Sequence, residues 1–463
     1  MDLAPSHARP FVNRREQLGQ RMSGTRLLMA SGAPSPRNYP ANAYPFRASS
    51  HFLYLFGSPL RESFALFEHG RWVVFTPPPN PNNALWHGPE PTLSDLSRSL
   101  ECEVRSIETL PDALGKLETL LTLPAPDYGT CRQQSAMLGR EILPGTIAEP
   151  DRPLAEAMVA MRIIHDDAAI AELRQASVAT AYAHAAGMRN THAGIRESAV
   201  RAAMESEIIA RDLTVAYGSI VSVQGEVLHN EHHGNTLCDG DLLLCDVGAE
   251  SSGGFAGDVT RTWPVSGRYS STQRDIYQIV LHAQADTISR VKPGASYRDL
   301  HLNATECIGK GLQDLGILKE GELCNIIEQG LVAMFFPHGI GHLLGLDVHD
   351  MEDLGDLAGY RKGASRSIAF GLKSLRLDRI LAPGMAVTIE PGFYQVPAIL
   401  EHPELGRDPA LNARIDWDRL AQFKDVRGIR IEDDILVTAQ GHEVLTAAIP
   451  KSISDVESVV GKA

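Results

Sequence analysis

The chain has 463 residues, 43% hydrophobic and 22% charged, which is ordinary globular usage and long enough for at least two domains. Its net charge of −14 argues against a nucleic-acid partner, because binding a phosphate backbone needs clustered Lys and Arg. No apolar stretch approaches the roughly 20 residues that span a bilayer, so we expect no membrane partner.

The cysteine pattern indicates a reducing compartment. The six cysteines are scattered without a CxxC pair, and the first residues contain no apolar signal core. We therefore expect a cytoplasmic protein.

The first part of the chain reads as a mixed α/β domain. Two short apolar runs, Phe52–Gly57 and Trp72–Phe75, are typical of strands, and residues 110–123 have a more helical pattern. A tract rich in Pro and acidic residues follows at 141–153, before an Ala-rich run begins. The predicted domains are therefore residues 1–160 and 161–463.

The second part predicts an α+β domain rather than regular βαβ units. Helices are expected at 166–186, 195–211 and 272–291, with short apolar strands and Gly-rich turns between the second and the third. A fold of this class does not require a parallel sheet.

An internal echo links two places in this domain. Gly240 leads through an apolar run to Asp246, and Gly384 leads through another apolar run to Glu390. A carboxylate at the end of a buried strand is costly unless something positive meets it. The repetition suggests two related halves that face one site.

Four motifs hold residues suited to metal chemistry. They are DVGAESSGGFAGDVTRTW with Asp246 and Asp258, HGIGHLLGLDVHD with His338, His342 and His349, TIEPG with Glu390, and RIEDD with Glu432. Hard divalent ions prefer carboxylate oxygens, and imidazole suits Mn, Fe, Co or Zn. Four carboxylates with one imidazole could hold two ions, which is a hydrolytic arrangement.

The order of these motifs resembles the pita-bread metallopeptidases, the family that contains methionine aminopeptidase, prolidase and Xaa-Pro aminopeptidase. The resemblance implies a catalytic domain with pseudo-twofold internal symmetry and two divalent ions, with Mn expected ahead of Zn, Co or Fe. Homodimers or homotetramers are expected from the same resemblance. The implied metal ligands are Asp246, Asp258, His342, Glu390 and Glu432.

The resemblance also implies individual roles. Asp258 and Glu432 would bridge the ions, Asp246 would complete one site, and His342 with Glu390 would complete the other. Glu390 would also take a proton from the attacking water.

Four more residues match family positions around the ligands. His229 and His349 would contact the substrate or stabilise its developing oxyanion, and His338 would be a nearby pocket histidine. Arg430 resembles the arginine that orients a ligand carboxylate.

The amino-terminal sequence indicates which branch of the family the chain resembles. FRASSHFLYLFG, residues 46–57, resembles the opening of the domain that precedes the catalytic domain in proline-specific members and that methionine aminopeptidases lack.

Two features depart from the family. Asp246 and Asp258 are twelve positions apart, one more than usual, which predicts a bulge or longer bend in their hairpin, and SVQGEVLHN lacks the Asn expected before His229.

Two proline-specific activities remain open. An Xaa-Pro aminopeptidase removes the first residue of longer peptides, and the stretches HDMEDLGD and EPGFYQVPAIL resemble bacterial proteins of that kind. Arg376 instead matches the prolidase arginine that binds the free carboxylate of an Xaa-Pro dipeptide. Leu344, Phe393 and Tyr394 are candidates for the apolar proline pocket, and all three are equally explained as core.

Two other classes share the fold. Creatinase works without metal, and some pita-bread domains only bind proteins, histones or RNA; both have lost the ligand set. All five ligand positions are filled here. The sequence therefore predicts a dinuclear-metal exopeptidase acting on peptides with proline in second position, an Xaa-Pro aminopeptidase with prolidase as the alternative.

Overall fold

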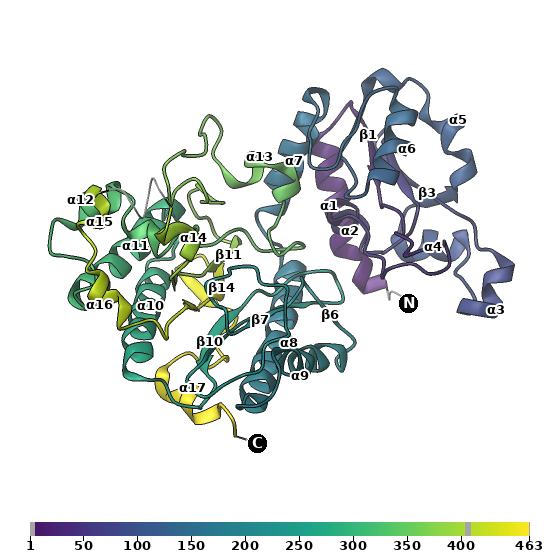
Figure 1. The fold of residues 1–463 in the computed structure, drawn as a ribbon. Helices are drawn as coiled ribbons and strands as arrows, with labels where there is room; N and C mark the ends of the chain where they lie inside the picture. The colour runs from purple at the N-terminus through teal and green to yellow at the C-terminus, as the bar shows by residue number, and fades with distance from the viewer. Residues whose placement is uncertain (1–4, 403–408, 463) are drawn as a thin grey trace. The chain divides into compact units, whose positions relative to one another are not determined.

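The computed structural model describes residues 5–402 and 409–462 and divides into two compact units. The first consists of Met1–Ile163 with the short segment Met351–Ala358, and the second of Ile164–Asp350 with Gly359–Ala463 (Figure 1). No helix in the described ranges is both long and apolar enough to cross a membrane.

The first unit is built on a mixed five-stranded sheet with the order β4-β3-β2-β1-β5. Its strands are β1 (Arg26–Ala30), β2 (Phe64–Glu68), β3 (Arg71–Thr76), β4 (Glu103–Ser106) and β5 (Leu120–Thr122). The three central strands pair antiparallel, and both outer strands pair parallel. The expected mixed α/β domain is present.

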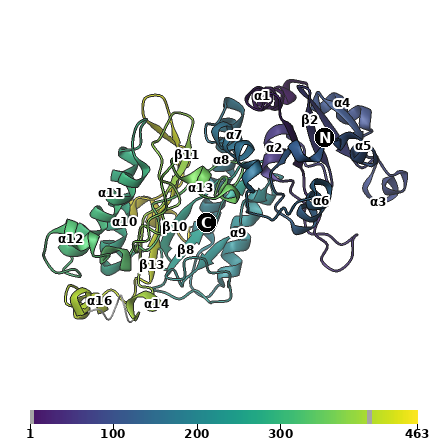
Figure 2. The same cartoon turned by 90° about the horizontal axis from the view of Figure 1, so that it is seen from above.

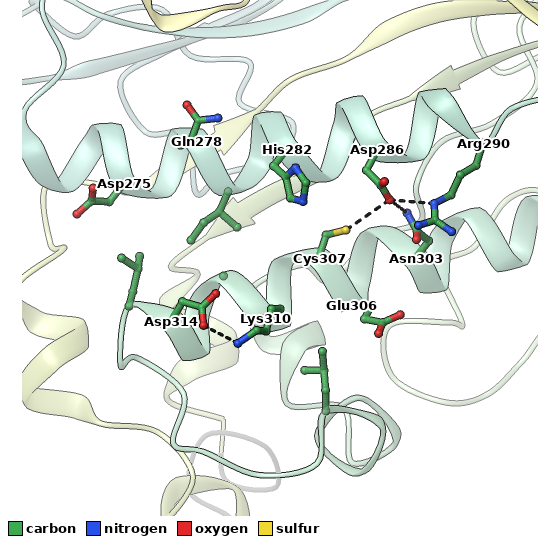
Figure 3. A pocket seen from close by; sticks show the side chains of 14 residues that line it. Asp275, Gln278, His282, Asp286, Arg290, Asn303, Glu306, Cys307, Lys310 and Asp314 are labelled. Atoms are coloured by element: carbon green, nitrogen blue, oxygen red, sulfur yellow. Dashed lines mark hydrogen bonds and ion pairs between the residues drawn. The ribbon is translucent and has the colours of Figure 1, made fainter.

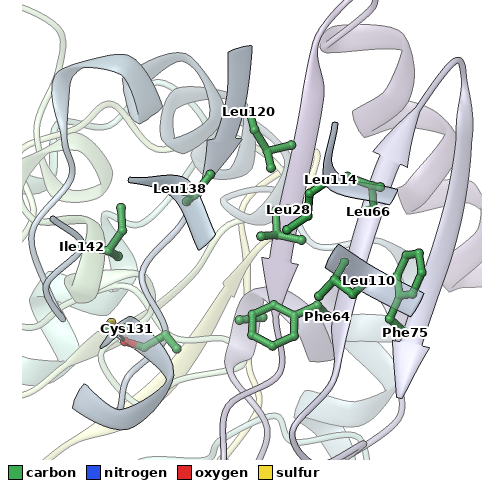
Figure 4. Packing of buried hydrophobic residues seen from close by; sticks show 12 residues of the cluster. Leu28, Phe64, Leu66, Phe75, Leu110, Leu114, Leu120, Cys131, Leu138 and Ile142 are labelled. Carbon is green, nitrogen blue, oxygen red and sulfur yellow. Dashed lines mark hydrogen bonds between the residues drawn. The ribbon is translucent and has the colours of Figure 1, made fainter. Parts of the chain in front are cut away.

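Seven α-helices accompany this sheet in the described part of the unit. They are α1 (Pro5–Arg21), α2 (Ser50–Phe56), α3 (Ala84–His87), α4 (Leu93–Leu100), α5 (Leu110–Leu114), α6 (Tyr128–Leu138) and α7 (Arg152–Arg162). Figure 4 shows side chains from strands and helices packed in one core, with Leu28, Phe64 and Leu110 among them.

Two predictions for this unit are wrong. The run Phe52–Gly57 forms helix α2 rather than a strand: Ser49 accepts a hydrogen bond from the Phe52 N–H, and Gly57 ends the helix at φ 60°. Because the helix is almost completely buried, its apolar run has no period that separates helix from strand. Residues 110–123 do not form one helix: α5 ends at Leu114, Gly115 at φ 53° interrupts it, and a 3-10 turn at Leu117–Thr119 leads into β5.

Two pairs of long helices frame the second unit. They are α8 (Asp167–Asn190) with α9 (Glu197–Ile209), and α10 (Ser271–Ser289) with α11 (Tyr297–Asp314). The first three agree with the predicted helices, and α11 was not predicted. The side chains of Asp166, Ser270 and Ser296 cap the starts of α8, α10 and α11. In Figure 2 the strands of this unit lie between the two helix pairs.

The strands of the second unit are short. They are β6 (Thr214–Val215), β7 (Ile220–Ser222), β8 (Leu242–Asp246), β9 (Ala249–Glu250), β10 (Thr260–Pro264), β11 (Ala386–Ile389), β12 (Gly392–Tyr394), β13 (Gly428–Arg430), β14 (Asp433–Val437) and β15 (His442–Val444). The short helices of this unit are α12 (Leu323–Glu328), α14 (Pro397–Leu400), α15 (Pro409–Asn412), α16 (Trp417–Ala421) and α17 (Ile453–Val459). The short helix α13 (Asp356–Gly359) begins in the segment Met351–Ala358 of the first unit.

The internal echo of the sequence corresponds to a repeated connection. Ahead of α9, the Gly194 N–H donates to the Leu237 carbonyl at 2.8 Å, and the chain then enters β8. Ahead of α11, the Gly294 N–H donates to the Leu381 carbonyl at 2.8 Å, and the chain then enters β11. Each half therefore ties a helix start to the segment that leads into a strand with a carboxylate at its end, Asp246 as the last residue of β8 and Glu390 directly after β11.

Of the two features expected in the hairpin between Asp246 and Asp258, a bulge or a longer bend, the bulge is absent. The two strands pair in one register from Pro264↔Leu242 to Thr260↔Asp246. The same register continues to the end of the hairpin, where the Ser251 N–H donates to the Phe255 carbonyl at 2.8 Å. Side chains alternate along a strand, so an even spacing of twelve in a continuous register already places both carboxylates on one face.

Candidate active site

All ten residues predicted for the site line a single cavity of about 210 Å³ in the second unit. They are His229, Asp246, Asp258, His338, His342, His349, Arg376, Glu390, Arg430 and Glu432. The cavity walls also include Leu228, Gly339, Gly341 and Ser374. The structure thus brings together residues that are up to about 200 positions apart in the chain.

Strand ends deliver the four carboxylates. Asp246 is the last residue of β8, and Asp258 lies on the returning arm of the same hairpin. Glu390 follows β11 and Glu432 precedes β14, and these two strands pair antiparallel up to Ile389↔Asp433. Both hairpins therefore end at the same cavity, each contributing two acids.

His342 is oriented by the backbone around it. Its Nδ1 lies 3.0 Å from the Leu343 carbonyl, which only accepts hydrogen bonds, so Nδ1 carries the proton and Nε2 keeps a free lone pair. Nε2 lies 3.3 Å from Asp258 Oδ2 and 3.7 Å from Glu390 Oε1. The His349 ring stacks on the His342 ring with centroids 3.9 Å apart.

The cluster fits a divalent metal centre by its donor set. Asp258, His342 and Glu432 are buried, and each offers one ligand atom within 4.8 Å of the others. Burial and neighbouring carboxylates raise the pKa of Asp258 to about 7 and that of Glu432 well above its ordinary value. Acids crowded in this way need cations to remain ionised together, and carboxylate oxygen with imidazole nitrogen suits divalent ions.

Arg430 is the fixed cation beside these acids. It is 3% exposed, and its guanidinium donates to Asp246 Oδ2 at 2.6 Å and to Thr260 Oγ1 at 2.9 Å. The Thr260 hydroxyl in turn donates to Glu432 Oε2 at 2.7 Å. One arginine therefore orients a carboxylate from each hairpin.

His338 is held as a neutral ring by a directed chain of hydrogen bonds. Arg430 Nη1 donates to the Tyr394 hydroxyl at 3.1 Å, Tyr394 donates to His338 Nε2 at 2.8 Å, and His338 Nδ1 donates to the Gly339 carbonyl at 2.8 Å. Burial, with Arg430 nearby, lowers the pKa of His338 to about 3. Nδ1 also lies 3.6 Å from Glu390 Oε2.

The three apolar candidates for a proline pocket are core residues. Leu344, Phe393 and Tyr394 are each at most 1% exposed, and none lines the cavity. Tyr394 contributes to the cavity indirectly, because its hydroxyl contacts His338 in the cavity wall.

Tyr217 is a site residue that the sequence motifs did not indicate. Its hydroxyl lies 2.5 Å from Asp246 Oδ1 and 2.7 Å from Asp258 Oδ1, so it joins the two acids of one hairpin. The residue lies just ahead of β7, which pairs with β8 through Ile220↔Asp246. That pairing is the only signal that places it, and the sequence does not reveal strand partners.

Glu197 is a second residue outside the motifs, and it ties down the loop that carries His229. This carboxylate is fully buried at the start of α9. Oε1 accepts from the Val223 N–H at 2.8 Å, and Oε2 accepts from the Asn235 N–H at 3.0 Å. Both ends of the loop 223–235 are therefore fixed by one side chain.

A larger cavity, of about 680 Å³, lies between α10 and α11 and holds none of the ten residues (Figure 3). Its polar side chains bond mainly to one another: Asp286 accepts from Arg290 Nε at 2.9 Å and from Asn303 Nδ2 at 2.8 Å, and Lys310 pairs with Asp314 at 2.6 Å. A reaction site needs polar groups that converge on a ligand, and of these two cavities the smaller one offers them.

Comparisons with known proteins agree with this geometry. Residues 171–439 match the metallopeptidase family M24, and residues 11–121 match the aminopeptidase P N-terminal domain. A Xaa-Pro aminopeptidase of Haemophilus influenzae is 33% identical, covering 97% of this chain and 96% of its own. A human Xaa-Pro dipeptidase is 28% identical, covering 97% of this chain and 92% of its own.

Solved structures give the same result. The aminopeptidase PepP of Pseudomonas aeruginosa superposes with a TM-score of 0.81 at 27% identity, covering 99% of this chain and 98% of that chain. Aminopeptidase P from E. coli with the inhibitor Pro-Leu superposes with a TM-score of 0.78 at 27% identity, covering 98% of both chains. The chain belongs to metallopeptidase family M24 and carries an aminopeptidase P type N-terminal domain.

Proposed function

We propose that the protein is an Xaa-Pro aminopeptidase, which removes the first residue from peptides with proline in second position. The observation that carries this proposal is the convergence of four carboxylates, four histidines and two arginines in one cavity. The support from relatives is that proteins named Xaa-Pro aminopeptidase match the chain over nearly its whole length.

The proposed metal ligands divide between two divalent ions. Asp258 and Glu432 would be shared between the ions, Asp246 would complete one site, and His342 with Glu390 would complete the other. Divalent ions in such a site lower the pKa of water and polarise a carbonyl. We propose Mn²⁺ ahead of Zn, Co or Fe, because oxygen ligands outnumber the single imidazole.

The remaining side chains handle the substrate and its protons. Glu390 takes the proton of the attacking water and delivers it to the proline nitrogen, which must be protonated before it can leave. His349 and His229 donate hydrogen bonds to the oxyanion that develops at the scissile carbonyl. Neutral His338, held by Tyr394, shapes the wall beside Glu390.

Arg376 supports a second candidate function, that of an Xaa-Pro dipeptidase. Its side chain lines the cavity beside Ser374. A guanidinium suits the free carboxylate of a dipeptide, because it can bind both oxygens at once. The human Xaa-Pro dipeptidase among the relatives shows that this activity occurs on chains of similar length.

Hydrolysis of Ala-Pro-Ala beside Ala-Pro separates the two functions. We expect protein loaded with Mn²⁺ to release alanine from the tripeptide, and chelator-treated protein to release none. Cleavage of the dipeptide alone, lost in Arg376→Lys, would establish the dipeptidase instead. Cleavage of neither peptide with metal bound would contradict both.

The compartment and assembly also remain proposals. All six cysteines are unpaired thiols, which agrees with a reducing cytoplasm. The homodimer or homotetramer proposed from the resemblance is measurable by light scattering on the purified protein, and a monomer would contradict it.

A further inference from the structure

A strongly basic stretch borders the candidate active site in an otherwise acidic chain. Residues 359–379, here called the basic loop, contain six basic side chains and one acidic, whereas the whole chain has a net charge of −14. The basic side chains are Arg361, Lys362, Arg366, Lys373, Arg376 and Arg379. The catalytic proposal uses none of them for the aminopeptidase reaction.

Hydrogen bonds bring the two ends of the basic loop together. The Asp378 N–H donates to the Gly359 carbonyl at 2.8 Å, and the Tyr360 hydroxyl donates to the Leu375 carbonyl at 2.6 Å. Arg366 Nη1 also donates to the Leu375 carbonyl at 3.0 Å. The segment is thus a closed surface loop with a defined base, rather than an open connection.

The returning limb of this loop forms part of the cavity wall. Ser374 and Arg376 line the cavity, and Leu375 between them packs against Gly339. A Cβ added at Gly339 would lie 3.1 Å from Leu375 Cα and 3.2 Å from the Ser374 carbonyl oxygen. The loop backbone therefore lies directly beside the residue that follows His338.

The charge that this loop presents to solvent is positive. Its one acid, Asp378, is 6% exposed and lies 3.9 Å from both Arg361 and Arg298. Lys362 and Lys373 are exposed, and Lys362 has no ion-pair partner among residues 5–402 and 409–462. Lys373 lies over the ring of Phe370, 5.6 Å from its centroid, which leaves its charge unneutralised.

The size of the cavity decides which part of a peptide meets the loop. At about 210 Å³ it is smaller than drug-sized ligand pockets, which occupy roughly 300–1,000 Å³. It therefore holds the residues at the scissile bond, and the rest of a longer peptide lies outside it. Apart from the proposed metal ligands and buried Arg430, Arg376 of the basic loop is the one permanently charged residue in the cavity wall.

We propose that the basic loop is a docking surface for the part of the substrate that follows proline, and that it selects peptides with acidic residues there. The proposal rests on the proposed aminopeptidase function and adds a substrate class to it. Opposite charges at the mouth raise the local concentration and the association rate of a charged substrate, without touching the reacting atoms. The attraction should therefore raise kcat/KM for acidic peptides at low salt and leave kcat unchanged.

Three amidated tetrapeptides test this preference: Ala-Pro-Glu-Glu, Ala-Pro-Lys-Lys and the neutral Ala-Pro-Gly-Gly. At about 20 mM salt we expect kcat/KM for the acidic peptide to exceed that for the basic one roughly tenfold. At about 500 mM salt the ratio should fall below roughly twofold, because exposed charges are then screened within a few ångströms. Equal kcat/KM values at low salt would overturn the proposal.

Reversing charges on the basic loop tests whether this loop causes the preference for acidic peptides. Lys362→Glu combined with Lys373→Glu should abolish or invert the preference while the neutral peptide is still cleaved at the wild-type kcat. The matched control, Lys319→Glu combined with Lys424→Glu, changes the net charge equally at exposed positions that do not line the cavity, and should keep the preference.

The outcomes distinguish a failure of the docking proposal from a failure of the proposed aminopeptidase function. If the Lys362→Glu, Lys373→Glu variant keeps the preference for the acidic peptide, that preference arises at another surface. The docking role of the basic loop would then be overturned. If the wild-type protein fails to cleave even the neutral peptide, the proposed aminopeptidase function itself is wrong.

Discussion

Asp246 is held on both of its carboxylate oxygens. Tyr217 contacts Oδ1 at 2.5 Å, and Arg430 donates to Oδ2 at 2.6 Å. Tyr217 also reaches Asp258, so the tyrosine and the arginine together set the separation and the rotation of the acids from the first hairpin. Partners of this kind orient proposed ligands before any ion binds, which makes the site cheaper to assemble.

Replacing Tyr217 with phenylalanine removes this contact and little volume. We expect Tyr217→Phe to bind Mn²⁺ about 10–100-fold more weakly, because Asp246 and Asp258 lose a shared partner. Competition with a fluorescent chelator measures the affinity.

The control removes another buried tyrosine hydroxyl. Tyr269→Phe loses a hydrogen bond to the Thr262 carbonyl at 2.8 Å, so it should lower the stability and leave the metal affinity unchanged. Wild-type affinity in Tyr217→Phe would show that the tyrosine is not part of the metal site.

Among the elements, the loop 223–235 depends most on a single side chain. Glu197 accepts from the backbone at both ends of this loop and from Asn235 Nδ2 at 3.0 Å. The loop is also packed tightly in the middle: a Cβ added at Gly225 would lie 2.7 Å from the Gly428 carbonyl oxygen. His229 is therefore carried by a loop whose position is set from α9.

Glu197→Gln tests this arrangement with almost no change in shape. An amide cannot accept on both sides, so one of its N–H groups would face a backbone N–H and push the loop away. We expect the unfolding free energy to fall by about 1.5–3 kcal/mol, the range for a hydrogen bond to a charged group. We also expect KM to rise while metal content, measured by mass spectrometry, stays at the wild-type value.

Glu207→Gln is the matched control on the same helix. Glu207 pairs with Arg211 on the surface, where such pairs contribute little. It should change neither KM nor metal content. An unchanged KM in Glu197→Gln, despite lost stability, would reduce Glu197 to a structural role.

The sequence predicted elements well where a pattern is local. The helix α8 and the strands ending at Asp246 and Glu390 follow from periodicity and from turn glycines, which need no knowledge of the partner strand. The buried run of α2 was ambiguous, and a bulge or longer bend between Asp246 and Asp258 was expected because the spacing was judged without the register. Tyr217 and Glu197 act through contacts between distant segments, which one sequence does not encode in a readable motif.

At the scale of the whole molecule, two buried neutral histidines make stability depend on pH. His184 is fully buried beside Trp263, and His301 is 3% exposed beside Phe336. Burial lowers the pKa of each to about 4. In the unfolded chain both would titrate near 6.5, so the unfolded state binds more protons between these values.

The stability that these two rings contribute should therefore be complete above pH 6.5 and decline as pH falls from 6.5 to about 4. His301→Phe should make this decline shallower, because a ring that cannot be protonated removes the contribution of His301. Urea unfolding at a series of pH values measures the slope. His69→Phe, at a side chain that is 90% exposed, should leave the slope unchanged; an unaltered slope in His301→Phe would show that this ring is not responsible.

We propose that the two hairpins and His342 form one site for two divalent ions. The most direct measurement is a titration of chelator-stripped protein with Mn²⁺, following bound metal and Ala-Pro-Ala hydrolysis together. We expect two ions to bind per chain, with activity complete when both are present. Full activity with one ion or none, or two ions bound by a variant carrying both Asp258→Ala and Glu432→Ala, would contradict it.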